Sequence, residues 1–153
     1  MTRRTGLAAL LASTLVTPAF AQDNEDSAVL QALEKFLYGW NSRDPVKYAD
    51  ALCFPHLILD GGRVTQYSTR EQFIARGKSL WDSAPAEWDH SEWIKREILQ
   101  RIGDTVHATG SWARKDKAGR TIGTADVLYV VVKRDGQWKI FARSGNRGPG
   151  AAR

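Results

Sequence analysis

The spacing of hydrophobic residues in the first half of the chain predicts three short helices. Over residues 27–40, apolar side chains recur at intervals of three and four, so they share one face of a helix. Asp44-Pro45 favours the start of a second helix over residues 46–52, with the carboxylate as N-cap and the proline in the first turn. A third helix follows the capping pair Thr69 and Gln72.

Alternating polar and apolar positions predict strands in the rest of the domain. Two short strands, His56–Asp60 and Arg63–Tyr67, flank a glycine turn. The second half of the chain predicts four long strands, Trp88–Arg101, Thr105–Arg114, Thr121–Arg134 and Gln137–Ser144. In the first of these long strands, strict alternation places Trp93 and Arg101 on one face and Arg96 on the other.

The first 21 residues have the layout of a secretory signal. Arg3 and Arg4 precede an apolar run over residues 6–16, and Ala19-x-Ala21 provides a small-x-small cleavage site. The apolar run is too short for a permanent membrane anchor. The alternative, a buried N-terminal helix, is disfavoured by a proline next to the cleavage site. We therefore expect a periplasmic or secreted protein after cleavage near Ala21, exported by the general or the twin-arginine route.

The expected organisation of the mature chain is a single domain with short ends. Residues 22–26 are polar and acidic and predict a flexible leader. Residues 27–146 carry all the predicted helices and strands, without an internal repeat, and the length leaves room for one domain. The end of the chain, residues 147–153, is rich in glycine and alanine and predicts a disordered tail.

Charge and cysteine content exclude several classes of function. The chain carries 22 basic and 17 acidic side chains. They are interspersed rather than gathered in a patch, so nucleic-acid binding is not supported. The single cysteine, Cys53, excludes an internal disulfide, lies too far from the cleavage site for a lipid anchor, and is expected to be a buried small residue. The three histidines lack metal-ligand spacing, so we expect neither a metal site nor a cofactor.

Three motifs give the chain a resemblance to a known superfamily. They are Phe36-x3-Trp40-Asn41-x2-Asp44, the turn Asp60-Gly61-Gly62, and the hairpin Tyr129-x5-Asp135-Gly136-x-Trp138-Lys139-Ile140. In this order they resemble the NTF2-like superfamily, which includes SnoaL-like and ketosteroid isomerase-like proteins, and in particular its secreted bacterial members without a defined reaction. The resemblance implies an α+β cone, with three N-terminal helices packed on a strongly curved, mostly antiparallel sheet. It also implies a mostly apolar pocket at one end of the cone.

The resemblance further implies candidate site residues. Asp60 falls near the catalytic base of ketosteroid isomerases, and Tyr129 falls near the donor that stabilises their enolate oxygen. Phe36 stands where those enzymes place a tyrosine, so half of their oxyanion hole is missing here. The inward strand faces that the resemblance implies carry four polar side chains, His107, Thr109, Ser111 and Arg143.

Each candidate also has a purely structural interpretation. Asp60 precedes two glycines and suits a turn, and Tyr129 suits a core phenol bonded to the backbone. His56 and His107 are either hydrogen-bonded structural side chains or general bases. Arg143, if it points inward, needs an acidic partner or an anionic ligand. If the strand parity shifts by one residue, Arg143 lies on the surface instead.

Six tryptophans are unusual in so small a domain. Trp93, Trp40 and Phe36 are expected to contact a flat or lipophilic ligand. Alternatively, large aromatic side chains fill the core or cover the convex face of the sheet, through which NTF2-like proteins commonly form homodimers.

These observations leave three functions open. We expect an exported domain whose apolar pocket binds a small aromatic or lipophilic molecule, with no reaction defined. The alternative is a cofactor-independent isomerase, dehydratase or hydrolase that uses Asp60 or a histidine as general base. The second alternative is a homodimerisation module without a ligand. The fold does not choose among them, because one fold hosts many unrelated activities.

Overall fold

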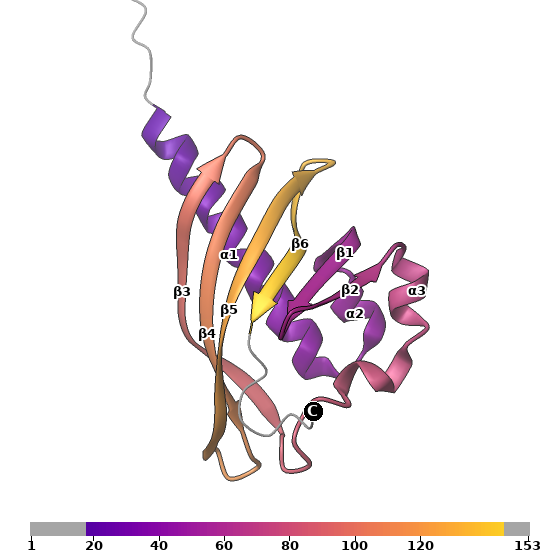
Figure 1. The fold of residues 1–153 in the computed structure, drawn as a ribbon. Coiled ribbons are helices and arrows are strands. Elements are labelled where there is room, and N and C mark those ends of the chain that lie inside the picture. The colour runs from indigo at the N-terminus through magenta and orange to yellow at the C-terminus, as the bar shows by residue number, and fades with distance from the viewer. Residues whose placement is uncertain (1–17, 146–153) are drawn as a thin grey trace, which may run out of the picture.

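A computed structural model describes residues 18–145, with side chains from residue 22 onward. A long helix, α1 (Pro18–Ser42), runs across one face of a curved six-stranded sheet (Figure 1). The short helix α2 (Pro45–Ala49) lies beside its C-terminal half, and another short helix, α3 (Arg70–Ile74), packs against α2 and β2. Among the described residues, no helix is both long and apolar enough to span a membrane. The α+β cone expected from the sequence is confirmed.

The sheet is antiparallel except at one pair of strands. Its spatial order is β2-β1-β6-β5-β4-β3, and only β1 and β6 run parallel. The strands are β1 (Leu52–Asp60), β2 (Arg63–Tyr67), β3 (His90–Ile102), β4 (Thr105–Lys115), β5 (Thr121–Arg134) and β6 (Gln137–Gly145). The parallel pair brings the β1–β2 hairpin beside the C-terminal strand, so segments far apart in sequence border the same part of the molecule.

The third predicted helix is two separate pieces. α3 ends at Ile74, and a 3-10 helix, η1 (Gly77–Trp81), follows it. Gly77 has a φ of 52°, a left-handed conformation at which an α-helix ends. The chain between Gly77 and Ala84 is therefore a turn-rich segment, and several of its side chains face the cavity described below.

The start of α1 corrects the flexible leader expected over residues 22–26. These residues are helical, and two of their acidic side chains are tied to the sheet. The contacts are Glu25 with Lys133 and Trp138, and Asp26 with Arg101. Because the partners lie 75 to 113 residues further along the chain, local sequence patterns do not reveal them. Residues 1–17 of the predicted signal and the predicted tail, residues 147–153, lie outside the described residues.

Two β-bulges in β3 interrupt the alternation expected from the sequence. The register with β4 shifts by one residue at Ile94 and again at Leu99. Each bulge inserts an extra residue and reverses the parity of the residues that follow. As a result, Trp93 and Arg101 lie on the same face of the sheet as Arg96, and the expected separation of these side chains is wrong.

The core forms where α1 packs against the inner faces of β4, β5 and β6. Phe36 of α1 meets Tyr129 of β5 edge to face, with ring centroids 5.5 Å apart, and Tyr129 meets Trp93 at 6.1 Å. Gly110 of β4 leaves room for these rings, because a Cβ there would lie 2.6 Å from the ring of Trp93. An aromatic cluster therefore fills the middle of the cone.

Replacing Gly110 with alanine should lower the free energy of unfolding by about 1–3 kcal/mol, because the Trp93 ring has to move away from the new methyl group. Gly123 of β5 is the matched control, since a Cβ there meets no atom within 4 Å. We expect Gly123→Ala to change the free energy of unfolding by less than about 0.5 kcal/mol. Urea unfolding measures both variants, and equal midpoints would contradict the close approach of Trp93 to Gly110.

Candidate functional site

A cavity lies between the C-terminal half of α1, the β1–β2 hairpin, the chain from α3 to Ala84 and the inner faces of β4, β5 and β6. Its volume is about 530 Å³, and small-molecule sites typically enclose about 300–1,000 Å³. Six aromatic side chains form much of its wall: Phe36, Trp40, Tyr48, Tyr67, Phe73 and Trp112.

Most of the aromatic side chains of the wall pack against one another. Trp40 stacks on Trp81 with ring centroids 5.8 Å apart, and Trp81 Nε1 donates a hydrogen bond to the Trp40 carbonyl oxygen at 2.8 Å. Tyr48 meets Trp40 at 5.8 Å and Phe73 at 5.2 Å, both close to edge to face. The wall is therefore formed by contacts within the protein and keeps its shape without a ligand.

Arg143 of β6 faces this cavity. It lies opposite Tyr129 in the β5–β6 ladder and beside Ile58 in the β1–β6 ladder, and Ile58 lines the cavity too. The guanidinium carbon is 5.7 Å from the centroid of the Phe36 ring. Of the two orientations that the sequence left open for Arg143, the structure has the inward one.

Tyr129 lies behind the cavity wall and is not among the lining residues. Its side chain is fully buried, and its hydroxyl makes no hydrogen bond of ordinary geometry with the described residues. Burial raises the pKa of the phenol and outweighs the nearby Arg143 charge and Trp112 indole, which favour the ionised form. The phenol therefore stays protonated at neutral pH.

His56 occupies a structural position. Its side chain is 1% exposed, and Nδ1 lies 3.2 Å from the carbonyl oxygen of Ile140, a contact that assigns the proton to Nδ1. Burial and the Arg143 charge lower the pKa of the imidazole to about 3. A ring with so low a pKa is a weak base at neutral pH, which favours the structural interpretation over a catalytic one.

Asp60 stands at the end of β1, where the strand enters the Gly61-Gly62 turn. Its side chain lines the cavity together with Arg63 on the returning strand. Asp60 lies two residues beyond Ile58, the neighbour of Arg143, and so shares the inward parity of that pair. A carboxylate and a guanidinium from adjacent strands therefore face the same cavity.

The candidates on β4 lie on the opposite face from the one expected. Val106 and Ala108 are fully buried against α1 and the aromatic cluster, and strand alternation places His107, Thr109 and Ser111 on the outer face. The prediction that these three residues line the pocket is wrong. The sequence did indicate the inner face of β4, because that face carries small residues, Ala108 and Gly110, which leave room for large rings.

The predicted aromatic contacts divide into two groups. Phe36 and Trp40 line the cavity. Trp93 packs against Gly110 and Tyr129 in the core and is not among the lining residues. Its place in the aromatic cluster favours the core interpretation for this tryptophan.

Arg114 is a lining residue that the sequence analysis missed. It follows Trp112 on the inner face of β4, and only 6% of it is exposed. Its guanidinium carbon is 5.2 Å from the centroid of the Trp112 ring. The wrong parity for β4 concealed it, because Arg114 belongs to the same alternating set as Val106 and Ala108.

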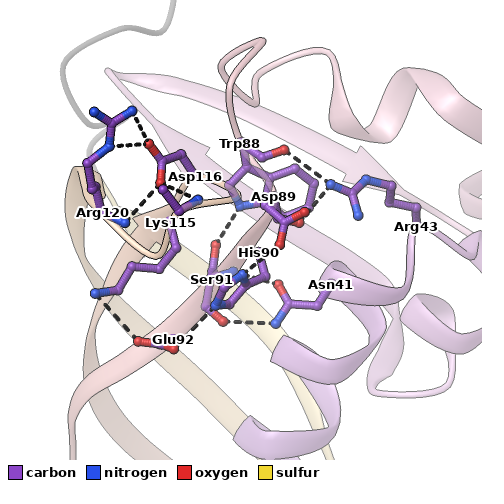
Figure 2. A network of polar contacts seen from close by, with 11 residues as sticks. Asn41, Arg43, Trp88, Asp89, His90, Ser91, Glu92, Lys115, Asp116 and Arg120 are labelled. Atoms are coloured by element: carbon purple, nitrogen blue, oxygen red, sulfur yellow. Dashed lines mark hydrogen bonds and ion pairs between the residues drawn. The ribbon is translucent and has the colours of Figure 1, made fainter.

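A hydrogen-bond network holds the end of α1 to the start of β3, next to the cavity (Figure 2). The Asn41 side chain donates to the Ser91 carbonyl oxygen at 2.8 Å and accepts from the Ser91 amide at 2.9 Å. Arg43 donates to the carbonyl oxygens of Trp88 and Asp89. These bonds fix the C-terminal end of the segment whose residues Asp82 to Ala84 line the cavity.

The described residues contain no group of three or more histidine, cysteine or acidic side chains arranged to hold a metal ion. The chemistry that the cavity offers comes from its carboxylates, its guanidiniums and its aromatic surface.

The low pKa of His56 makes stability depend on pH. Its folded pKa lies below the unfolded value of about 6.5, so the unfolded chain binds more protons. Stability from this group is full above pH 6.5 and falls as the pH drops toward 3, by at most about 1.4 kcal/mol per pH unit. Urea unfolding between pH 7 and pH 4 should therefore show a shallower slope in His56→Gln than in the wild type.

His90→Gln is the control for that measurement. Asp89 and Glu92 raise the pKa of this exposed histidine, so its contribution has the opposite sign and grows as the pH falls. The same slope for His56→Gln and the wild type would show that folding does not lower the pKa of His56.

Comparison with known proteins identifies the fold independently. A family model described as NTF2-like protein (DUF6841) matches residues 24–146. A search of curated proteins finds no match.

Solved structures with a similar fold come from several bacteria. A protein of unknown function from Mycobacterium tuberculosis has a TM-score of 0.66 and 16% identity, covering 86% of this chain and 76% of its own. A cystatin-like protein of unknown function from Nostoc punctiforme has a TM-score of 0.67 and 12% identity, covering 80% and 90%.

A protein described as a dehydratase of the NTF2-like family, from Streptomyces avermitilis, has a TM-score of 0.62 and 13% identity, covering 82% of this chain and 96% of its own. At such identities the likeness shows the fold alone. The family model spans most of the chain, and the structure has the architecture that the model describes. The chain therefore belongs to the NTF2-like family DUF6841.

Proposed function

We propose that this domain binds a small molecule with a flat aromatic or lipophilic body in the cavity beside α1. The observation that carries the proposal is a cavity of about 530 Å³ lined by six aromatic side chains, five of which pack against one another. Rigid aromatic walls bury apolar ligand surface at little conformational cost, because their side chains are already ordered.

The size of the hydrophobic contribution indicates what else the ligand needs. Burying about 200 Å² of apolar ligand surface contributes about 5 kcal/mol. A micromolar dissociation constant corresponds to about 8 kcal/mol, and association also costs entropy. Stacking on the rings and a few polar contacts have to supply the difference. Arg143, Arg114 and Asp60 are the charged groups on the inner strands that are placed to supply such contacts.

We place this binding outside the cytoplasm. The signal-like layout of residues 1–21, with its basic start, short apolar run and small-x-small site, supports export. The ligand would then be a molecule of the periplasm or of the surroundings of the cell.

A second candidate function is proton transfer at a bound carbonyl compound, with Asp60 as base. The observation that favours it is the position of Asp60, which shares the cavity wall with Arg143. The carboxylate would remove a proton beside the carbonyl group, and the guanidinium would stabilise the developing oxyanion. Solved structures of similar fold include a ketosteroid isomerase-like protein from Erwinia carotovora, at 14% identity.

Thr65→Trp should weaken binding of 2-naphthol at least tenfold, because Thr65 is an exposed lining residue on β2 and an indole there obstructs the cavity. Gln66→Trp is the matched control: Gln66 is the next residue of the same strand, is exposed, and does not line the cavity. Isothermal titration calorimetry measures both. If the wild type binds none of 2-naphthol, 2-naphthamide and 2-naphthoate, the proposal fails.

Proton exchange tests the second candidate separately. In D₂O the wild type should accelerate deuterium uptake beside the carbonyl group of 2-tetralone, followed by NMR. Asp60→Asn should remove the acceleration while leaving affinity for the ketone unchanged, since a base contributes to turnover and not to ground-state binding. Exchange no faster than in buffer would leave only the binding function.

A further inference from the structure

Arg114 is a buried cation without a counter-ion among the described residues. Only 6% of the residue is exposed, and its Nε atom is buried with no hydrogen-bond partner. Burial of an unpaired charge is costly, and proteins normally compensate it with an anion. A guanidinium cannot relieve this cost by losing its proton, because it stays charged in proteins.

The acidic residues near Arg114, along β4 and on the paired strand β3, have other partners. Asp116 lies two residues further along and is as deeply buried. Its oxygens accept from the amides of Ala118 and Arg120, and it is ion-paired with the Arg120 side chain (Figure 2). Glu92 forms ion pairs with His90 and Lys115.

The carboxylates of the cavity do not neutralise Arg114 either. Two of them, Asp60 and Asp82, belong to the lining, but the described residues contain no salt bridge from either one to Arg114. Burial lowers the pKa of the Arg114 guanidinium, and no carboxylate raises it again. The guanidinium is therefore a cation within the cavity lining whose anionic partner the described residues do not supply.

We propose that the ligand of this cavity carries a carboxylate, which binds to Arg114 while the apolar body of the ligand packs against the aromatic wall. The proposal rests on the binding function proposed above and adds the chemical class of the ligand: a lipophilic or aromatic carboxylic acid. Trp112, which lies beneath the guanidinium at 5.2 Å, offers the first aromatic surface next to the bound carboxylate.

A single carboxylate suits the arrangement of the two inner arginines. Arg114 lies opposite Gly123 and Arg143 lies opposite Tyr129, six residues apart on β5. Six residues span about 20 Å along a strand, so the two arginines extend into the cavity from well-separated backbone positions. A planar carboxylate can accept two parallel hydrogen bonds from one guanidinium, whereas a doubly charged phosphate gains from several cations.

The matched ligands 2-naphthoate and 2-naphthamide test this proposal. They share the aromatic body and the planar polar group, and they differ in charge. Because hydrogen bonds between charged groups are the strong ones, we expect the wild type to bind 2-naphthoate roughly tenfold to a hundredfold more tightly, measured by isothermal titration calorimetry at pH 7. In Arg114→Met that preference should vanish while the affinity for 2-naphthamide stays unchanged. Arg134→Met is the control, because Arg134 is an exposed arginine at the end of β5 that does not line the cavity, and this variant should keep the preference.

The possible results of this experiment separate the carboxylate assignment, the role of Arg114 and the binding function. Equal affinities of the wild type for the two compounds would overturn the carboxylate assignment and leave the binding function intact. Loss of the preference in Arg143→Met but not in Arg114→Met would overturn the role of Arg114. Binding of neither compound would overturn the assignment, and failure of 2-naphthol as well would remove the binding function. If Arg114→Met does not fold, Arg114→Gln replaces it.

Discussion

The edge-to-face contact between Phe36 and Tyr129 determines where the solid core ends and the cavity begins. Phe36 reaches from the middle of α1 onto the sheet, and Tyr129 meets it from the central strand β5. Tyr129 is fully buried on one side of this contact, whereas Phe36 also borders the open space. With a tyrosine in place of Phe36, a further hydroxyl would enter the cavity wall. The phenylalanine keeps that part of the wall apolar, which suits binding better than oxyanion chemistry.

The elements that local patterns encode could be predicted from the sequence. The apolar spacing of α1, the N-cap of α2 by Asp44 and the tight turn at Asp135-Gly136 all depend on residues within a few positions of one another. Features that depend on distant partners could not be predicted. Glu25 and Asp26 near the start of α1 are held by Lys133 and Arg101, which lie far along the chain. The alternating pattern of β3 gives no sign of its two bulges.

The residues of the candidate site likewise divide into those that the sequence placed correctly and those that it did not. Asp60, Phe36, Trp40 and Arg143 face the cavity, and each was chosen from a motif or from alignment with the superfamily. The choice on β4 came from the inward face that the resemblance implied, and a parity wrong by one residue exchanged every side chain of that strand between the two faces. The wrong parity led to the choice of His107 and to the omission of Arg114. Arg114 belongs to the same alternating set as the buried residues Val106, Ala108 and Gly110. A run of small residues facing large aromatic ones is therefore a better guide to the inner face than polarity.

The acidic residues at the start of α1 would acquire another role if the predicted signal were removed. In the full chain the helix begins at Pro18, and its first turn holds no acidic residue. Cleavage after Ala21 would make Gln22 the new start, so that Asp23 and Glu25 would fall in the first turn. There their negative charges meet the positive end of the helix dipole and the new terminal ammonium group. Cleavage at the predicted site would thus improve the electrostatics of the helix on which the cavity is built.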